Sequence, residues 1–570
     1  MTGRGPAPSR PDWADLTKGI HMTAASPARP PASSFYRYAA LLPDRVAVIE
    51  ADGARTTYGE LHRRANQVSR ALRALGVGEA ERVAALTGNT VRFFELVFGA
   101  GQVGVQLVPV STHLTVDEIA YILDNSASRF VFAEEQYLAR AAEALAAFGR
   151  PPDDLIAVDA PPAADSSGRA RPDGSARPDG SARPDGSARS YGDLVTAQPD
   201  TEPAGRVHAQ PLLYTSGTSG RPKGVVWPVR AAVAPEEALA STDALMAARG
   251  MRHDPTAITL VTGPLYHGAP YSWAVQGLHR GHTVVLPGRW DSEGFLRLVE
   301  RYRVTTAQLA PIHFHRLLSL PAAVRARYDT SSLRVVSHAG APTPVEVKRR
   351  MIDWWGPVLE EYYACSEGYG TNISSADWLA HPGSVGRADA AGVRMKILDP
   401  DGREAPPGTP GTLWVRNPTA VNSSYLGDSD RTAAQRDDDG YYTVGDMAYI
   451  DADGWLFIVD RRTDLILSGA VNIYPAEVER ALRAHPAVAD VAVIGLPDPE
   501  WGQRVHAVVV AAPGREPGPE LAEEIRAVAA ERLARFKVPR HIEFTDALPY
   551  SPTGKLLRRE LRDRAGAGGG

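Results

Sequence analysis

The segment between positions 214 and 225 carries the residue types of a phosphate-binding loop. It reads Tyr214-Thr-Ser-Gly-Thr-Ser-Gly-Arg-Pro-Lys-Gly-Val225 and follows a short apolar run that is typical of a strand end. Its consecutive Ser, Thr and Gly residues cannot pack a core, but their N–H groups and hydroxyls can surround an anion, and Lys223 adds a positive charge. The spacing differs from that of a Walker A loop. The residues expected to bind phosphate are Thr215, Ser216, Gly217, Thr218, Ser219, Gly220 and Lys223.

Further polar motifs follow this loop along the chain. They read His338-Ala-Gly-Ala-Pro342, Glu361-Tyr-Tyr-Ala-Cys-Ser-Glu-Gly368, Tyr442-Thr-Val-Gly-Asp446 and Leu548-Pro-Tyr-Ser-Pro-Thr-Gly-Lys-Leu556. Together with the loop they resemble the signature motifs of the adenylate-forming superfamily, which includes acyl- and aryl-CoA synthetases, luciferases and nonribosomal-peptide adenylation domains. The resemblance extends from Ser34 to Leu561. It implies an enzyme that uses ATP and Mg²⁺ to transfer AMP to a small acid.

The resemblance also implies a role for individual nucleotide-binding residues. Tyr363 would stack on adenine, and Asp446 would accept hydrogen bonds from both ribose hydroxyls, since one carboxylate can bind a vicinal diol. Glu367 would hold Mg²⁺ together with Thr215, because a hard cation on phosphate prefers oxygen ligands. The other residues expected at the nucleotide are Gly340, Ala341, Pro342, Ser366, Arg461 and Lys555.

The expected catalytic residues are Lys555, Lys223 and His267. By the resemblance, Lys555 reaches the active site across a domain interface and bridges the acid and the α-phosphate. Its ammonium would offset the repulsion between the two anions. His267 lies in Pro264-Leu-Tyr-His-Gly-Ala-Pro-Tyr271, which resembles the segment that closes the acid pocket. Tyr266 and His338 are further candidates for that pocket.

The acceptor of the activated acid is a separate question. The pocket segment is most similar to fatty-acyl and bile-acid-type CoA ligases, so we expect the acyl group to pass to coenzyme A after the small domain rotates. Three positions depart from the family pattern: Thr463 at the hinge, Ala470 in Ser-Gly-Ala, and Ala364. Ala470 would narrow the path of the thiol, and Ala364 would favour a small or flat acid. An amide synthetase, a nitrite-activating diazotase and a degenerate nucleotide-binding protein therefore stay open as alternatives.

The elements that must position these residues alternate between helical and strand patterns. Helices are expected at Leu61–Leu75 and Thr115–Leu123 and a buried strand at Val83–Leu86, which predicts an α/β fold with mostly parallel sheets. A G-x-G-x-x-G run, Gly99–Gly104, follows a helical face instead of a strand, so we assign it to packing and not to a dinucleotide.

Five parts of the chain are expected. Residues 1–33 form a disordered leader, in which Met22 is a second candidate start, and residues 34–460 form the large ATP- and acid-binding domain. A low-complexity insertion at 160–190 contains the repeated Arg-Pro-Asp-Gly-Ser-Ala. Residues 461–562 form a small mobile α+β domain with helices Pro475–Ala484 and Pro519–Arg535 and strands Val488–Ile494 and Val505–Val510, and 563–570 form a tail.

Composition narrows the function classes. The net charge of −5 gives no basic footprint for nucleic acid, and no apolar run is long enough to span a membrane. The leader lacks the apolar core of a secretory signal. A single cysteine, Cys365, fits the reducing cytoplasm. A homodimer and a carrier protein in trans are left open as partners.

Overall fold

The structure is a computed structural model that describes residues 34–158, 189–215, 222–227, 233–239, 242–388, 392–417, 423–461, 464–468, 471–498, 502–552 and 554–567. The predicted leader and residues 160–188 of the predicted insertion lie outside these ranges. None of the described helices is long and apolar enough to cross a bilayer.

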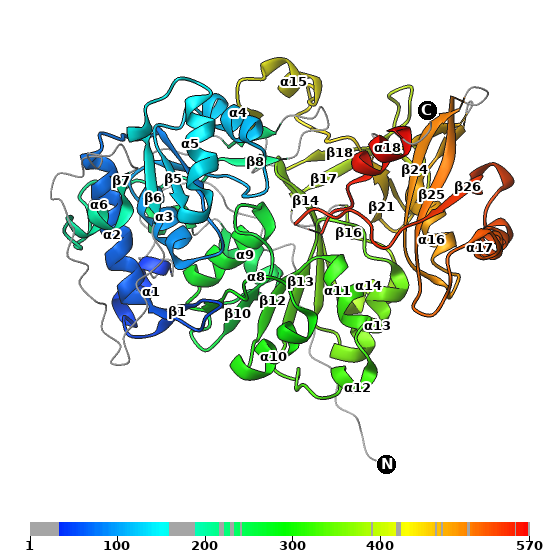
Figure 1. The fold of residues 1–570 in the computed structure, drawn as a ribbon, viewed down its shortest axis with the longest axis horizontal. Coiled ribbons are helices and arrows are strands. Elements are labelled where there is room, and N and C mark those ends of the chain that lie inside the picture. Colours follow the sequence, from blue (N-terminus) through cyan, green and yellow to red (C-terminus); the bar gives the residue numbers. More distant parts are fainter. Residues whose placement is uncertain are drawn as a thin grey trace, which may run out of the picture.

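A long, mostly parallel sheet forms the centre of the molecule (Figure 1). Its order is β15-β14-β13-β12-β10-β11-β1-β2, with parallel pairing from β14 to β1 and antiparallel strands at both edges. The strands are β1 (Val46–Ile49), β2 (Arg55–Thr57), β10 (Ile258–Val261), β11 (Thr283–Val285), β12 (Thr306–Leu309), β13 (Val335–His338), β14 (Leu359–Cys365) and β15 (Gly368–Ser374). The helices of this part are α7 (Pro235–Leu239), α8 (Asp243–Ala248), α9 (Gly268–His279), α10 (Ser292–Tyr302), α11 (Pro311–Leu318), α12 (Ala322–Arg325), α13 (Val345–Trp355) and α14 (Ser375–Ala380).

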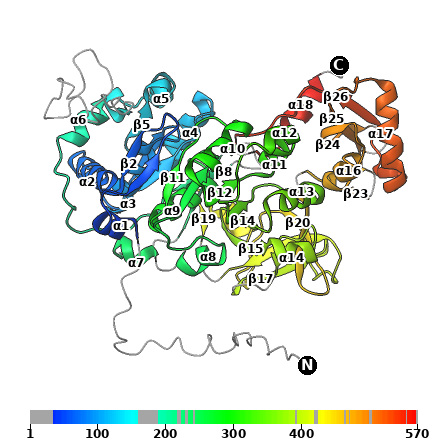
Figure 2. The same ribbon diagram turned by 90° about the horizontal axis from the view of Figure 1, so that it is seen from below.

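A second parallel sheet, in the order β4-β3-β5-β6-β7, lies at one end of the molecule, on the left in Figure 2. Its strands are β3 (Arg82–Leu86), β4 (Gln106–Pro109), β5 (Val131–Glu134), β6 (Leu155–Val158) and β7 (Arg189–Ser190). The associated helices are α1 (Phe35–Leu41), α2 (Tyr58–Ala74), α3 (Val91–Gly101), α4 (Val116–Ser126), α5 (Leu138–Ala146) and α6 (Tyr191–Thr196). The two parallel sheets confirm the predicted α/β fold class.

Smaller antiparallel sheets complete the large domain. One has the order β16-β21-β20-β18-β17 and the other β19-β9-β8. These elements are β8 (Leu213–Thr215), β9 (Lys223–Val226), β16 (Gly386–Arg387), β17 (Arg394–Leu398), β18 (Gly411–Arg416), β19 (Ser424–Tyr425), α15 (Ser429–Ala434), β20 (Asp446–Ile450) and β21 (Trp455–Arg461).

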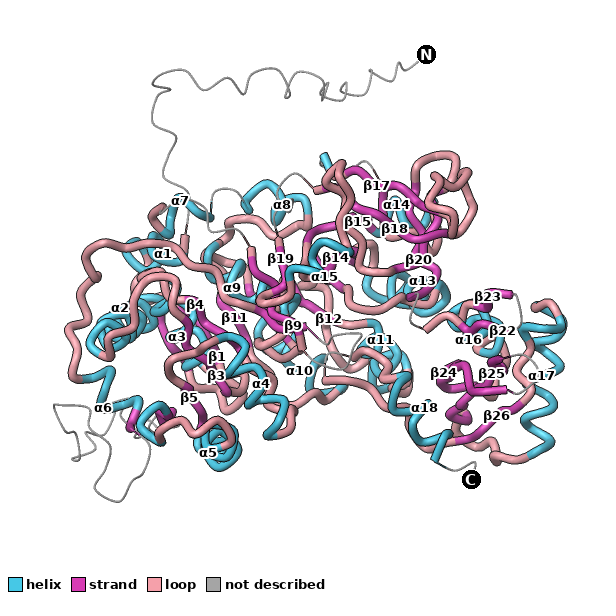
Figure 3. Tube along the Cα trace, turned by 90° about the horizontal axis from the view of Figure 1, so that it is seen from above, coloured by secondary structure: helices cyan, strands magenta, loops and turns pink. Residues whose placement is uncertain are grey.

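The C-terminal α+β unit lies at the opposite end of the molecule from the β4–β7 sheet (Figures 1 and 3). Its sheet has the order β23-β22-β25-β24, and β26 pairs with β25. The elements are β22 (Ile466–Ser468), β23 (Val471–Ile473), α16 (Pro475–Leu482), β24 (Val488–Asp498), β25 (Gly502–Ala511), α17 (Pro519–Arg532), β26 (His541–Phe544) and α18 (Arg558–Ala567). Helix α18 runs past the predicted domain end at 562, because Leu561 is buried and Arg562 pairs with Asp464.

The helix and strand predictions hold, with shifts at their ends. Helix α2 begins three residues before the predicted Leu61, because Thr57 and Glu60 form a capping box that satisfies the first backbone N–H groups. Gly99 lies inside helix α3, where a Cβ would come within 2.5 Å of Cγ1 of Val68. The glycine therefore serves helix packing, as the sequence predicted.

Two buried histidines, His282 and His313, are expected to make the folded protein less stable in acid. Burial lowers the pKa of His282 to about 4 and that of His313 to about 3, whereas a histidine in an unfolded chain titrates near 6.5. The unfolded chain thus binds protons that the folded chain does not, so stability falls as the pH drops through this window. Between pH values of about 7 and 5, each histidine is expected to contribute a loss of about 2 kcal/mol.

Thermal unfolding followed across this pH range tests the expectation. His282→Gln should flatten the pH dependence of the unfolding midpoint, whereas His541→Gln, at an exposed position of β26, should leave it unchanged. An unfolding midpoint that stays constant from neutral to mildly acidic pH would show that protonation of the buried histidines does not destabilise the protein.

Candidate functional site

The large cleft of the molecule lies at the carboxyl ends of β10, β12, β13 and β14, the edge at which open α/β sheets bind ligands. The segments that follow these strands, 263–264 with 266–267, 310–313, 339–342 and 366–367, all line it. Its volume is about 3520 Å³, against roughly 300–1,000 Å³ for a typical single-ligand pocket. The cleft therefore has room for more than one substrate group.

The predicted phosphate loop lies between two paired strands. β8 and β9 form an antiparallel hairpin in which Thr215 lies opposite Lys223, and both residues line the cleft. Ser216, Gly217, Thr218, Ser219 and Gly220 lie outside the described residues. The hairpin thus places Thr215 and Lys223 side by side where the two strands meet the loop.

The predicted metal ligand, Glu367, is connected to this hairpin through Tyr425 of β19. The Tyr425 hydroxyl donates to Glu367 Oε1, and the Nζ of Lys223 lies 5.1 Å from the centre of the Tyr425 ring. Burial, and then the Glu367 carboxylate, raise the pKa of Tyr425, which keeps the proton on its hydroxyl. Sequence reasoning missed Tyr425, because only the pairing of β19 with β9 brings it here.

Gln435 extends this chain of hydrogen bonds. Its Oε1 position is 2.6 Å from the Tyr425 hydroxyl. A hydroxyl has one proton, and the Glu367 carboxylate is the stronger acceptor. The Gln435 amide must then present its NH₂ group to Tyr425, and amide orientation is interchangeable in this way. The result is a chain of donors that ends on Glu367.

The predicted adenine and ribose residues are neighbours. The Tyr363 hydroxyl donates to Asp446 Oδ2 at 2.6 Å, and the Tyr363 ring packs against Gly370, where a Cβ would lie 2.4 Å from Cδ1 of the ring. Asp446 pairs in register with Arg461 across β20 and β21, although only the backbone of Arg461 is described.

Gly340, Ala341 and Pro342 line the same cleft, as does Ser366. Gly340 has a φ of +91°, a conformation that favours glycine. The turn that ends β13 therefore depends on this residue.

Lys555, in the C-terminal unit, acts electrostatically on His267 of the large domain. His267 is the N-cap residue of α9, and the surrounding protein, followed by the Lys555 ammonium, lowers its pKa to about 4. The imidazole is therefore neutral near pH 7. A Cβ on Gly554 would come within 2.5 Å of Ile312 Cγ2 and 3.1 Å of Ala310 Cβ. The lysine loop thus packs directly on the large domain at the start of α11.

Two features near the nucleotide residues differ from the sequence analysis. His338 is wrong as a pocket candidate: it is fully buried, its Nδ1 lies 3.2 Å from Thr343 Oγ1, and it packs edge-on to Phe314. The buried ion pair of Lys348 and Glu361, at 2.5 Å, was not foreseen. Burial lowers the pKa of Lys348 and raises that of Glu361. The attraction between the two opposite charges shifts each pKa partly back in the other direction. This pair joins α13 to β14 behind the loop at 339–342.

Comparison with known proteins decides the family. Residues 35–426 match the family model described as AMP-binding enzyme, and residues 477–555 match the AMP-binding enzyme C-terminal domain. The chain belongs to the AMP-binding enzyme family.

Curated relatives in this family align along almost the whole chain. A fatty acid–[acyl-carrier-protein] ligase, ScoC, from Streptomyces coeruleorubidus is 34% identical over 517 residues, which cover 90% of this chain and 92% of the relative. A feruloyl-CoA synthase from Amycolatopsis is 34% identical over 525 residues, with 90% and 95% covered. The ATP-bound structure of MatB from Rhodopseudomonas palustris superposes with a TM-score of 0.75 at 26% identity, covering 94% of this chain and 99% of that one.

Membership in the AMP-binding enzyme family makes the chain an ATP-binding, AMP-forming ligase. The match to the C-terminal domain model ends at Lys555. Of the positions that depart from the family pattern, Ala364 lines the cleft, whereas Thr463 and Ala470 lie outside the described residues.

Proposed function

We propose that this enzyme activates a carboxylic acid with ATP, releases pyrophosphate, and passes the acyl group to coenzyme A. In the first step a carboxylate oxygen attacks the α-phosphorus while the bond to pyrophosphate breaks. In the second step the thiolate of coenzyme A attacks the acyl carbon and AMP leaves. Relatives named as a fatty acid–[acyl-carrier-protein] ligase and a feruloyl-CoA synthase support thioester formation as the overall reaction.

The position of Lys555 carries this proposal. Its loop packs on the large domain, its charge acts on His267, and it lines the cleft together with Lys223, Glu367 and Asp446. An ammonium between a carboxylate and a phosphate offsets their mutual repulsion and stabilises the charge that develops as they react. Neutral His267 borders the acid pocket without adding a second positive charge beside Lys555.

The residues around Glu367 fit a magnesium ion that arrives with the nucleotide. Mg²⁺ is commonly bound by one or two carboxylates and by phosphate oxygens, and Glu367 and Thr215 supply one carboxylate and one hydroxyl at this cleft. Bound there, Mg²⁺ would neutralise phosphate charge. Tyr425 would orient the carboxylate through its hydrogen bond. We place the reaction in the cytoplasm, in keeping with the single cysteine.

The deciding experiment measures AMP and pyrophosphate release from ATP with a panel of fatty, aryl and amino-aryl acids and nitrite. Each acid is assayed alone and with coenzyme A, an amine or an acyl carrier protein. We expect AMP formation with one acid class to rise steeply with coenzyme A. AMP formation that depends on another acceptor contradicts transfer to coenzyme A. Dependence on an amine would indicate an amide synthetase, dependence on a carrier protein an acyl-carrier-protein ligase, and dependence on nitrite with an aromatic amine a diazotase.

Tyr425→Phe is expected to weaken nucleotide binding without abolishing catalysis. The variant loses the hydrogen bond to the Glu367 carboxylate, an interaction with a charged group that is typically worth about 1.5–3 kcal/mol. The KM for ATP–Mg²⁺ should rise by at least about tenfold, and Mn²⁺ bound with ATP, titrated by electron paramagnetic resonance, should bind correspondingly less tightly.

Tyr449→Phe is the matched control for this variant. Tyr449 stacks on Phe457 at 4.7 Å and lies outside the cleft lining. Equal KM values in the two variants would show that the Tyr425 hydroxyl does not position Glu367.

A further inference from the structure

The loop that carries Lys555 is a tight hairpin. Tyr550 and Leu556 face each other in an antiparallel bridge, and the Ser551 N–H donates to the Lys555 carbonyl oxygen at 2.7 Å. The Ser551 hydroxyl accepts from the Lys555 N–H at 3.0 Å. Figure 1 shows the segment between β26 and α18 extending from the C-terminal unit to the large domain, where its tip packs on the start of α11. The position of Lys555 therefore depends on what holds the two arms of this hairpin.

The first arm is attached to strand β24 of the C-terminal unit. The Tyr550 hydroxyl donates to Asp490 Oδ2 at 2.7 Å, and Nη2 of Arg483 lies 3.5 Å from Asp490 Oδ1. Burial, and then the Asp490 carboxylate, raise the pKa of Tyr550, so the hydroxyl keeps the proton that it donates. One hydrogen bond to a carboxylate thus fixes the arm that enters the hairpin.

The second arm is attached by Arg558, the first residue of α18. Its two terminal nitrogens contact different carboxylates: Nη2 lies 2.7 Å from Glu479 Oε1, and Nη1 lies 3.5 Å from Asp464 Oδ2. Arg562, four residues further along α18, contacts Asp464 Oδ1 at 3.3 Å. Asp464 lies two residues before β22, the first strand of the C-terminal unit. Arg558 therefore joins the lysine hairpin both to α16 and to the start of this unit.

We infer that Tyr550 and Arg558 are positioning residues for adenylation, which hold the backbone under Lys555 so that its ammonium reaches the acid and the α-phosphate. This inference rests on the part proposed for Lys555. A misplacement of about 1 Å can cost a reaction about 10²-fold in rate, so a hairpin anchored at both arms matters for the adenylation step. Thioester formation does not bring two anions together beside Lys555 and does not need this anchoring.

Single substitutions in the two arms provide the first test. Tyr550→Phe removes one hydroxyl and keeps the ring, and kcat for ATP–pyrophosphate exchange should fall about tenfold, in line with the loss of a hydrogen bond to a charged group. Arg558→Ala should lower exchange about 10- to 100-fold. Arg558→Lys should recover part of that loss, because an ammonium lacks the planar fork that contacts two carboxylates at once. Thioester formation from a preformed acyl adenylate should stay within about threefold in each variant, and equal losses in the two half-reactions overturn the inference.

Combination with Lys555→Ala provides the second test. A residue that acts through Lys555 has no ammonium left to position in that background, so Tyr550→Phe and Arg558→Ala should each lower the remaining exchange by less than about twofold. Losses that multiply in the double variants show that the two residues only stabilise the C-terminal unit, and they overturn the inference while the part proposed for Lys555 stands. If Lys555→Ala alone exchanges pyrophosphate at the wild-type rate, that part fails and the inference fails with it.

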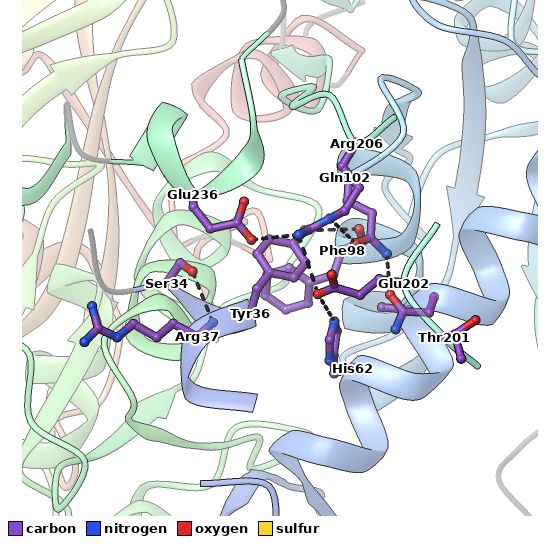
Figure 4. A network of polar contacts seen from close by, with 12 residues as sticks. Ser34, Tyr36, Arg37, His62, Phe98, Gln102, Thr201, Glu202, Arg206 and Glu236 are labelled. Atoms are coloured by element: carbon purple, nitrogen blue, oxygen red, sulfur yellow. Dashed lines mark hydrogen bonds and ion pairs between the residues drawn. The ribbon is translucent and has the colours of Figure 1, made fainter. Parts of the chain in front are cut away.

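Arg206 provides the matched control (Figure 4). It also contacts two carboxylates, Glu236 at 2.8 Å and Glu202 at 3.6 Å, and 15% of its side chain is exposed, against 16% for Arg558. Arg206 does not line the cleft. Arg206→Ala should lower the thermal unfolding midpoint, and any loss of exchange that it causes should multiply with the loss from Lys555→Ala. If the loss from Arg206→Ala instead disappears in the Lys555→Ala background, the double variants do not detect positioning and the inference is overturned.

Discussion

Lys555→Ala is expected to lower the rate of ATP–pyrophosphate exchange by about 10²–10³-fold, the range found when one preorganised charge-stabilising group is removed from an active site. The physical reason is that, in the proposed reaction, the carboxylate and the α-phosphate are both anionic and would approach each other beside Lys555, whose charge acts on His267. Formation of the thioester from a preformed acyl adenylate and coenzyme A does not bring these two anions together. That second half-reaction should therefore stay within about threefold of wild type.

Lys537→Ala controls for the loss of a positive charge in the same domain. Lys537 pairs with Glu477 at 2.7 Å and lies outside the cleft lining. The control should retain the exchange rate. If Lys555→Ala exchanges pyrophosphate at the wild-type rate, Lys555 does not bridge the acid and the α-phosphate; if both half-reactions fall together, Lys555 acts on the fold and not on adenylation.

Local patterns predicted most of the fold because they depend on residues close in sequence. Helix α2, strand β3 and the elements of the C-terminal unit were expected near their observed bounds, since apolar spacing and glycine or proline breaks determine them locally. The order of strands in the sheets was not predicted. It depends on which strands pair across long separations, and α/β alternation alone is compatible with several orders.

The sequence could indicate candidate-site residues that lie within one continuous motif. It could not indicate residues that reach the site only because distant strands or helices pack together. Glu367 and Asp446 were expected from their motifs, but Tyr425 joins Glu367 only because β19 pairs with β9. The ion pair of Lys348 and Glu361 crosses from α13 to β14 in the same way. His338 was misplaced because a motif indicates proximity to the site, while burial against Phe314 decides where the side chain lies.

Glu367→Gln should slow adenylation as much as the loss of Lys555 does, because it removes the proposed metal ligand instead of the bridging ammonium. Glutamine keeps the size of the side chain and can still accept from Tyr425, but it carries no charge to hold a cation on the phosphates. We expect kcat/KM for ATP–Mg²⁺ in the exchange reaction to fall about 10²–10³-fold, and the Mg²⁺ concentration for half-maximal rate to rise.

Glu360→Gln, in the adjoining strand β14, separates this effect from a general loss of negative charge nearby. Glu360 is the neighbour of Glu361 on the strand, but its Oε2 accepts from Asn372 Nδ2 at 3.1 Å. Because Glu360 does not line the cleft, its variant should keep the wild-type dependence on Mg²⁺. A Glu367→Gln enzyme with an unchanged Mg²⁺ requirement would remove Glu367 from the metal site, and the Tyr425 hydroxyl would then serve only to hold β19 against the turn between β14 and β15.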